Sequence, residues 1–181
     1  MRQTLALMSA PTSIQPGGYV SVAYAGRTAP LTPTVEIVVE PADEAWRISL
    51  AWDCPQPVND ASRETDRFVD ACAIFAPEVP GAPWITMGAP RMAVHGWLWH
   101  ADRTEPWQVR AEGLGTMQRA AAPSAARVDP AWKSGRWHVT FALPEWRALA
   151  TQRRFALAIW RGAGQERGGL KSVSPDWIAL P

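Results

Sequence analysis

The sequence lacks both an excess of one charge and any long hydrophobic segment. Its 181 residues include 18 basic and 17 acidic side chains, with a net charge of +1, so the basic surplus typical of nucleic-acid-binding proteins is missing. No apolar run exceeds six residues, the length of residues 155–160, whereas a membrane-spanning helix needs about 18. Large apolar residues nevertheless occur along the whole length, which argues against extensive disorder. Length and composition together predict one globular domain.

Cysteine is scarce, with only Cys54 and Cys72 in the chain. No Cys-x-x-Cys-His run is present, which excludes covalent c-type haem attachment through that motif. Two thiols are also too few for a zinc or iron–sulfur site held mainly by cysteine. Both cysteines lie at strand-like positions and have two interpretations: a disulfide across a sheet, or two small buried apolar side chains. The second interpretation is favoured.

Histidine is also rare and forms no recognisable catalytic motif. His95, His100 and His138 occur without a nucleophile elbow, a His-Glu-x-x-His helix or a diagnostic carboxylate pair. A glycine-rich phosphate loop is missing as well. His95 and His100 are five residues apart on an expected strand and would face opposite sides, so they would not share a metal ion. The sequence therefore gives no support for a stand-alone hydrolase.

Tryptophan, by contrast, is abundant, with 11 Trp against 4 Phe and 2 Tyr. Most tryptophans in most domains pack in the core or at interfaces. A second interpretation is that some are exposed platforms that stack on sugars or other flat ligands. The candidates for such platforms lie near expected loops: Trp84, Trp97, Trp99, Trp107 and Trp132.

Proline and glycine divide the chain into two parts. Residues 1–33 are expected to form an extended N-terminal arm with one short strand at residues 19–24, and residues 34–181 form the domain. The first ten residues carry one positive charge and an apolar stretch shorter than a signal peptide needs. No secretory signal is predicted.

The domain shows the two-residue period of β-strands. Apolar and polar residues alternate at 46–52 and 137–143, as in half-buried strands. Apart from Glu36 and Asp70, residues 35–39, 68–76 and 155–160 are apolar in both registers, as strands buried on two faces are. These segments are separated by turn-rich stretches, which favours an antiparallel arrangement.

Helix signals are few. Residues 144–150 are expected to form two helical turns with proline at the first helical position. Residues 111–127, rich in Ala, Pro and Gly, lack an apolar face and are expected to form a loop. With the strands, these features predict a mainly β fold: an antiparallel β-sandwich with long loops and one or two short helices.

Two further stretches each place one electron-donating side chain beside small residues. Residues 83–90 contain Met87 next to a glycine, and residues 166–175 contain Lys171 shortly after two glycines. Taken alone, these side chains would be interpreted as a core methionine and a solvated lysine.

The two stretches belong to a longer series of ordered segments. The series comprises Ile-Ser-Leu-Ala-Trp-Asp at 48–53, Asp-Arg-Phe-Val-Asp-Ala-Cys-Ala-Ile-Phe-Ala-Pro at 66–77, Met-Gly at 87–88, Trp-Leu-Trp at 97–99, Glu-Gly-Leu-Gly-Thr at 112–116, Gly-Arg-Trp-His-Val at 135–139, Phe-Ala-Leu-Ala-Ile-Trp at 155–160 and Glu-Arg-Gly-Gly-Leu-Lys-Ser-Val-Ser at 166–174. It resembles the haem b-binding γ subunit of ethylbenzene dehydrogenase and its relatives, the γ subunits of dimethyl sulfide dehydrogenase, selenate reductase and chlorate reductase. These belong to the type II dimethyl sulfoxide reductase family.

The resemblance implies a pair of haem ligands. In that family a methionine sulfur and a lysine amine hold the haem iron, and the matching positions are Met87 and Lys171. The alternative thioethers, Met92 and Met117, lack the Met-Gly context, and the only other lysine, Lys133, lies in an expected turn. An amine must be neutral to coordinate, so a lowered lysine pKa is implied. A methionine ligand raises the haem potential.

The resemblance also implies features of the surrounding pocket. Gly88 and Gly169, the latter preceded by Gly168, would let the backbone approach the haem closely. Arg91 or Arg167 would pair with the haem propionates.

The function implied is electron transfer without bond chemistry in this subunit. A non-covalently held haem b would relay electrons between an iron–sulfur β subunit and a soluble cytochrome c or similar carrier. The substrate would react at a molybdenum cofactor in a separate α subunit. A periplasmic location is implied, with the cytoplasm as the alternative. The alternative function, suggested by the tryptophans, is a carbohydrate-binding module without haem.

Overall fold

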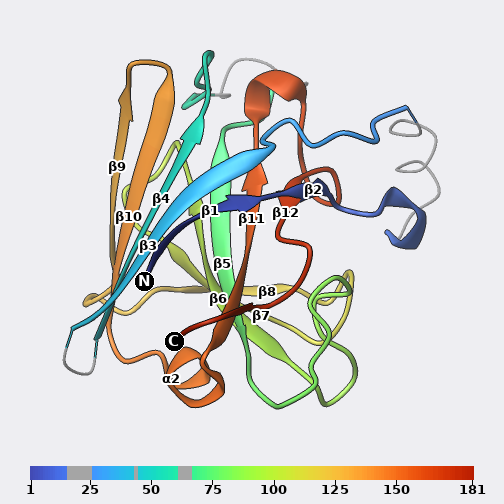
Figure 1. The fold of residues 1–181 in the computed structure, drawn as a ribbon, viewed down its shortest axis with the longest axis vertical. Helices are drawn as coiled ribbons and strands as arrows, with labels where there is room; N and C mark the ends of the chain where they lie inside the picture. Colours follow the sequence, from blue (N-terminus) through green and yellow to red (C-terminus); the bar gives the residue numbers. More distant parts are fainter. Residues whose placement is uncertain (16–25, 43–44, 61–66) are drawn as a thin grey trace.

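Two antiparallel β-sheets pack against each other in the computed structural model, which describes residues 1–15, 26–42, 45–60 and 67–181 (Figure 1). The five-stranded sheet has, in spatial order, β1 (Arg2–Ala6), β3 (Thr34–Ala42), β4 (Ala45–Asp53), β10 (Arg136–Leu143) and β9 (Arg127–Lys133). The mainly β sandwich predicted from the sequence is confirmed.

The eight-stranded sheet is built around three central strands, and the remaining strands are short or lie at its edge. Its order is β2 (Met8–Ser9), β12 (Ser172–Val173), β11 (Arg154–Trp160), β5 (Ala71–Pro77), β6 (Val94–His100), β7 (Trp107–Ala111) and β8 (Gln118–Ala121), with β13 (Ile178–Ala179) also paired to β11. β8 lies within the segment expected to be a loop, and all four of its residues are exposed.

Alternating side chains of β4 and β10 form the core between the sheets. Ile48 pairs with Phe141, and Trp52 pairs with Trp137 in the antiparallel register. All four are buried, while their neighbours along each strand are more exposed. Burial of each such side chain contributes about 1.5–3 kcal/mol. The alternation read from the sequence at these two strands is confirmed.

Strands β5 and β11 are buried on both faces, as their two-sided apolar pattern predicts. One face joins the core between the sheets, and the other is covered by loop side chains in a second apolar cluster. The same prediction for residues 35–39 is wrong, because Glu36 is exposed and β3 is buried on one face only. Its outer face is covered by no second layer, so only the inward-facing residues need be apolar.

The N-terminal segment takes part in both sheets. β1 pairs with β3, and β2 pairs with β12. The first residues of this segment are therefore extended, as expected, and they pair with strands of the two sheets. The strand expected at residues 19–24 lies outside the described residues. The division into an arm and a domain stays a prediction.

The helices are shorter and later than expected. α2 spans Arg147–Gln152 and begins three residues after Pro144, so the proline precedes the helix and does not occupy its first position. Two 3-10 turns, η1 (Thr12–Ile14) and η2 (Gly162–Gly164), complete the helical elements of the described residues. Within that part of the chain, no helix is both long and apolar enough to span a membrane.

Cys54 and Cys72 are both buried and not linked to each other. Burial raises the pKa of Cys54 to about 12, and it raises that of Cys72 as well. The favoured interpretation of two small buried side chains is confirmed.

Candidate functional site

A cavity of about 530 Å³ lies on the face of the eight-stranded sheet that points away from the other sheet. This volume falls in the range of about 300–1,000 Å³ that is usual for ligand and cofactor pockets. Its lining comes from strands β5, β6, β8 and β11 and from the loops around Met87 and Lys171. Its lining residues are Gln15, Phe68, Val69, Ala71, Met87, Leu98, His100, Leu114, Gly115, Met117, Arg119, Trp160, Glu166, Arg167, Gly168, Gly169 and Lys171.

Met87 is presented to the cavity by a tight turn. Its backbone N–H donates to the Trp84 carbonyl at 2.7 Å, and the next N–H, of Gly88, donates to the Pro83 carbonyl at 2.8 Å. The φ angle of Met87 is 56°, in the left-handed region that a non-glycine residue rarely adopts. Such a conformation stores strain and is found preferentially at functional sites.

Gly88 is required at this turn for two reasons. Its φ angle is 88°, and a Cβ atom at this position would lie 2.6 Å from the Met92 carbonyl oxygen and 3.0 Å from that of Ala111. The space beside Gly88 is therefore filled by the protein's own backbone. Gly88 does not line the cavity, but it fixes the path of the chain that carries Met87 into it.

Lys171 is the residue just before β12, and its side chain extends into the cavity. Its carbonyl accepts a hydrogen bond of 2.9 Å from the Ala10 N–H, which anchors this position to the N-terminal segment. The side chain is 8% exposed, and burial lowers the pKa of its amine to about 8. Nζ lies 5.1 Å from the ring centre of Trp160.

The amine and the thioether meet inside the cavity. Nζ of Lys171 lies 3.9 Å from Sδ of Met87. This sulfur is the hydrogen-bond partner of the amine among the described residues, and the bond is weak. No carboxylate of the described chain forms an ion pair with it. A buried amine with such neighbours favours its neutral form.

Tryptophans join the two loops that carry these side chains. Nε1 of Trp84 donates to the Ser174 carbonyl at 2.7 Å, and Nε1 of Trp177 donates to the Ala82 carbonyl at 2.8 Å. The Trp84 ring also lies 5.4 Å from Phe75 and 5.5 Å from Trp177, centre to centre. The separation of Met87 and Lys171 is thus set by a packed scaffold.

Glu166, His100 and Arg119 are polar residues of the cavity that were not assigned to it from the sequence. Glu166 is buried, its carboxylate accepts from the Arg161 N–H at 2.8 Å, and burial raises its pKa to about 7. Burial, and secondarily the charge of Arg119, lowers the pKa of His100. His100 and Arg119 come from β6 and β8, so only sheet pairing brings them to this loop-based site; no local motif marks them.

The structure brings most of the sequence-predicted residues to the cavity, but not all. Those that line it are Met87, Lys171, Gly169, Arg167 and the neighbouring Gly168, together with the alternative thioether Met117. Those outside the lining are Gly88, Arg91, Met92 and Lys133. The backbone N–H of Arg91 instead faces the Glu112 carboxylate at 3.4 Å, whereas the Arg167 guanidinium lies 4.5 Å from the Phe68 ring centre.

The two histidines of β6 face opposite sides, as predicted. His100 lines this cavity, and His95 lines a different one. Among the described residues, no group of three or more His, Cys, Asp or Glu side chains could hold a metal ion.

The interpretation of the tryptophans as exposed platforms is largely wrong. Trp84, Trp97 and Trp99 are buried in the two apolar clusters, Trp107 is half-buried, and only Trp132 of the five is exposed. The packing interpretation accounts for the three buried rings because they fill apolar space between elements.

No protein-family model matches the chain. Three curated proteins do. A protein named as a respiratory nitrate reductase heme subunit from Haloferax mediterranei is 34% identical over 125 residues, 64% of this chain and 44% of the relative. The chlorate reductase subunit gamma of Ideonella dechloratans is 31% identical over 145 residues, 74% and 58% of the two chains. The dimethylsulfide dehydrogenase subunit gamma of Rhodovulum sulfidophilum is 29% identical over 161 residues, 81% and 60%.

This chain is similar to a protein named as a heme subunit and to gamma subunits of a reductase and a dehydrogenase. The resemblance inferred from the ordered segments is thereby confirmed at the level of the chain. The chain spans about half the length of the gamma-type haem subunits it matches, 44–60% of each. The roles of individual residues stay predictions.

Proposed function

We propose that this chain binds a non-covalent haem b with Met87 and Lys171 as the two axial ligands of the iron. The observation that carries the proposal is the pairing of a buried thioether and a buried amine without a carboxylate partner, 3.9 Å apart in one cavity. Lys171 is 8% exposed, so it is not the solvated lysine of the alternative interpretation.

The donor set fits an iron ion placed between its two atoms. Zinc bonds to cysteine sulfur and to histidine nitrogen, taken as a guide, are about 2.3 Å and about 2.0 Å long, which sum to about 4.3 Å. The sulfur and nitrogen atoms lie 3.9 Å apart, so a movement of a few tenths of an ångström would admit the metal. Rotation within two flexible side chains supplies such a movement.

The chain's own residues prepare the site. Burial favours the neutral amine of Lys171, and only the neutral amine has a lone pair to donate. The thioether of Met87 is a soft ligand that favours the ferrous state and raises the reduction potential. Arg167 and Arg119, on the cavity lining, would pair with propionates. The bound haem supplies a one-electron redox centre.

The relatives' names support a role in electron transfer within a larger enzyme. One is named as a heme subunit, and two are named as gamma subunits of a reductase and of a dehydrogenase. We therefore infer that this chain relays electrons between an iron–sulfur β subunit and a soluble cytochrome c or similar carrier. The substrate would react at a molybdenum cofactor in a separate α subunit, and the complex would be periplasmic.

Substitution of each ligand tests the assignment. In protein purified with haem or reconstituted with it, Met87→Ala and Lys171→Ala should each lose or shift the low-spin Soret and α bands, because each removes one axial donor. Circular dichroism would establish that each variant is folded. Unchanged bands in both folded variants would remove these two residues as ligands.

The chain offers matched controls for both substitutions. Met117→Ala removes the other thioether of the same cavity, and Lys133→Ala removes the only other lysine. Both controls should leave the bands in place. A spectrum that responds to Met117→Ala and not to Met87→Ala would transfer the sulfur ligand to Met117.

A separate measurement tests the type of haem. A b-type pyridine haemochrome and complete extraction of the pigment into acidified acetone would support a non-covalent haem b. A colourless protein that takes up no added haem would overturn the proposal and return attention to a carbohydrate-binding function.

A further inference from the structure

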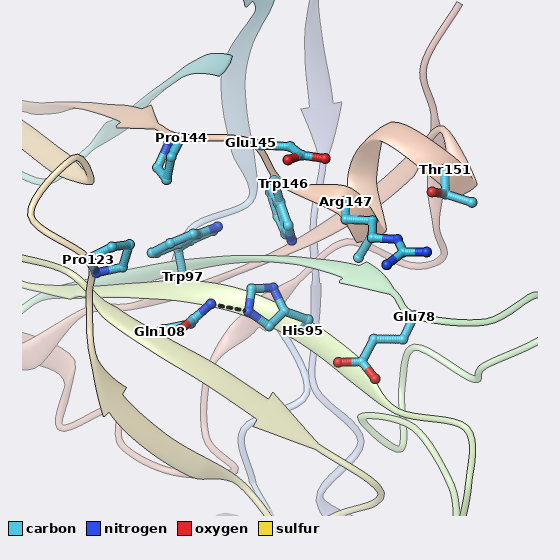
Figure 2. A pocket seen from close by; sticks show the side chains of 11 residues that line it. Glu78, His95, Trp97, Gln108, Pro123, Pro144, Glu145, Trp146, Arg147 and Thr151 are labelled. Atoms are coloured by element: carbon cyan, nitrogen blue, oxygen red, sulfur yellow. Dashed lines mark hydrogen bonds between the residues drawn. The ribbon is translucent and has the colours of Figure 1, made fainter. Parts of the chain in front are cut away.

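A second cavity lies at the end of the sandwich where α2 sits, on the inner side of β6 (Figure 2). Its volume is about 530 Å³. Strands of the eight-stranded sheet supply one side, and the segment from Pro144 to Thr151, which includes α2, supplies the other. The residues used below are His95, Trp97, Gln108, Pro144, Trp146 and Arg147.

Three buried ring nitrogens converge on this cavity without a partner. Nε1 of Trp97, Nε1 of Trp146 and Nδ1 of His95 make no hydrogen bond to the described residues. The two tryptophans are 1% and 2% exposed. Figure 2 shows the three nitrogens directed toward one another, and the rings pack edge-on with centres 5.8–6.4 Å apart. Buried polar groups are nearly always hydrogen-bonded, so this cluster calls for a ligand.

The third nitrogen is a donor, like the two indoles. The Gln108 amide nitrogen lies 2.8 Å from Nε2 of His95, and an amide NH₂ can only donate. Nε2 therefore accepts, which puts the proton of the neutral imidazole on Nδ1. Burial lowers the pKa of His95, which favours this neutral form. The cavity thus presents three ring N–H donors, beside the side-chain amide of Gln108.

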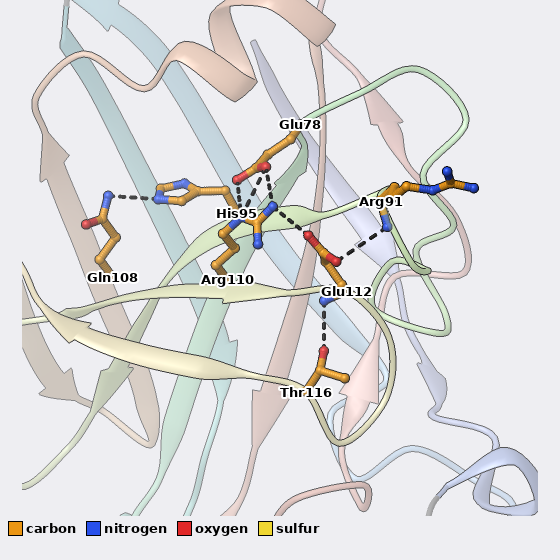
Figure 3. Close-up of polar contacts among 7 residues, drawn as sticks. All are labelled: Glu78, Arg91, His95, Gln108, Arg110, Glu112 and Thr116. Atoms are coloured by element: carbon orange, nitrogen blue, oxygen red, sulfur yellow. Dashed lines mark hydrogen bonds and ion pairs between the residues drawn. The ribbon is translucent and has the colours of Figure 1, made fainter.

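The rim carries charges of both signs, because the exposed Glu145 and Arg147 both line the cavity. Arg110 donates to both oxygens of Glu78 at 3.0–3.2 Å and to Glu112 at 2.8 Å, so the carboxylate of Glu78 beside the cavity is already paired (Figure 3). The guanidinium of Arg147 is exposed on the cavity lining. It can pair with an incoming anion.

We propose that this cavity binds a small organic carboxylate. Binding would separate the three packed rings, whose nitrogens each expose less than 1 Å². The ligand's oxygens then accept from the N–H groups of Trp97, Trp146 and His95, and its apolar part lies against the prolines of the wall. A carboxylate accepts hydrogen bonds and donates none, which matches the three ring N–H donors.

The proposal does not depend on haem binding. Successive side chains of β6 point to opposite faces, so Trp97 faces the second cavity and Leu98 faces the first. The two sites share a strand but no lining residue.

Titration of sodium benzoate into the full chain by calorimetry tests the proposal. We expect saturable one-to-one binding, and weaker binding of benzyl alcohol, which has the same ring but no carboxylate. Equal affinity for the two compounds would overturn the carboxylate assignment. A titration without a saturable binding heat would overturn the proposed binding site and indicate a cavity filled by water.

Two pairs of variants locate the binding. Trp146→Phe keeps the ring and removes one donor, so it should weaken benzoate binding about ten- to hundredfold. Trp52→Phe removes an equally unpartnered indole N–H from outside the cavity and should have no effect. Equal weakening in both would refute the location.

Arg147→Gln, at an exposed position that folding tolerates, should weaken binding about three- to tenfold. Arg154→Gln, also exposed but outside the cavity, should not. Unchanged affinity in Arg147→Gln would remove the guanidinium from the site. Nuclear magnetic resonance supplies a readout that needs no variant to fold, since benzoate should shift two indole N–H signals of the unaltered protein.

Discussion

At Met87 and Gly88, two consecutive residues have positive φ angles of 56° and 88°. The turn is held by backbone hydrogen bonds to Trp84 and Pro83, and the glycine leaves no room for a side chain. A methionine in this conformation is held by its surroundings and does not adopt it by its own preference. The local backbone therefore decides where the sulfur points.

Gly88→Ala should destabilise the protein by about 2–4 kcal/mol, because the new Cβ would meet the Met92 carbonyl at 2.6 Å in a disfavoured backbone region. Urea unfolding measures the effect. Gly135→Ala is the matched control: its φ is 79°, but nothing lies within 4 Å of an added Cβ. The control should cost about 1 kcal/mol. Equal losses in both variants would refute the close approach as the cause.

Glu166 makes stability depend on pH. Burial raises its folded-state pKa to about 7, from an ordinary value of 4.5, so the folded protein holds the proton more tightly than the unfolded chain. The contribution of Glu166 to stability is fully present below pH 4.5, is lost as pH rises to 7 and is level above it. Relative to Glu166→Gln, the native protein should lose about 3 kcal/mol across this window.

Urea unfolding of native protein and Glu166→Gln at a series of pH values measures this difference. The exposed Glu145→Gln serves as the control and should follow the native curve. A constant difference between native protein and Glu166→Gln from pH 4.5 to 7 would contradict the raised pKa.

At the scale of elements, Asp70 ties four parts of the fold together just before β5. Its buried carboxylate accepts from the N–H groups of Val58 and Gly162 and from Nε1 of Trp137, at 2.7–2.9 Å. Cys54 Sγ lies 3.4 Å from the same group. The carboxylate thus joins β10 of one sheet to the loop that leaves β11 of the other.

Asp70→Asn should destabilise the protein by about 2–4 kcal/mol, because the amide nitrogen would face an N–H donor that the carboxylate oxygen now satisfies. Chemical denaturation measures the loss. Asp129→Asn, at an exposed position of β9, should change stability by no more than about 0.5 kcal/mol. A similarly small effect at Asp70 would show that the network is not stabilising.

Features that depend on residues close together in the sequence could be predicted, and features that depend on distant residues could not. The alternation in β4 and β10 is local, and it predicted both strands and their buried faces. The start of α2 was missed because Pro144 lies in the approach to the helix. Met87 and Lys171 could be named only through the family resemblance. His100 and Arg119 could not be named, since strand pairing alone brings β6 and β8 to the same cavity.

At the scale of the whole molecule, haem binding would link the loops on the outer face of the eight-stranded sheet. The proposed ligands are 84 residues apart in the sequence, so one bound group would connect segments that follow β5 and β11. A ligand that binds only the folded state stabilises it by mass action.

Removal of haem should lower the thermal unfolding midpoint by roughly 5–10 °C. Free haem at about one hundred times its dissociation constant stabilises the folded state by about 3 kcal/mol, and this stabilisation is lost with the haem. Scanning calorimetry of haem-loaded and haem-free protein measures the difference. Lys171→Ala should show a smaller haem-dependent increase than Lys133→Ala. Identical midpoints with and without haem would contradict specific binding to the folded chain.

The alternation of side chains in β6 has a genetic consequence. His95 and Trp97 line the chamber near α2, and Leu98 and His100 line the chamber near Met87. A substitution in either pair should therefore impair one chamber and spare the other. Insertion of a single codon within this strand would exchange the two sets of side chains, so both chambers would be lost in one step.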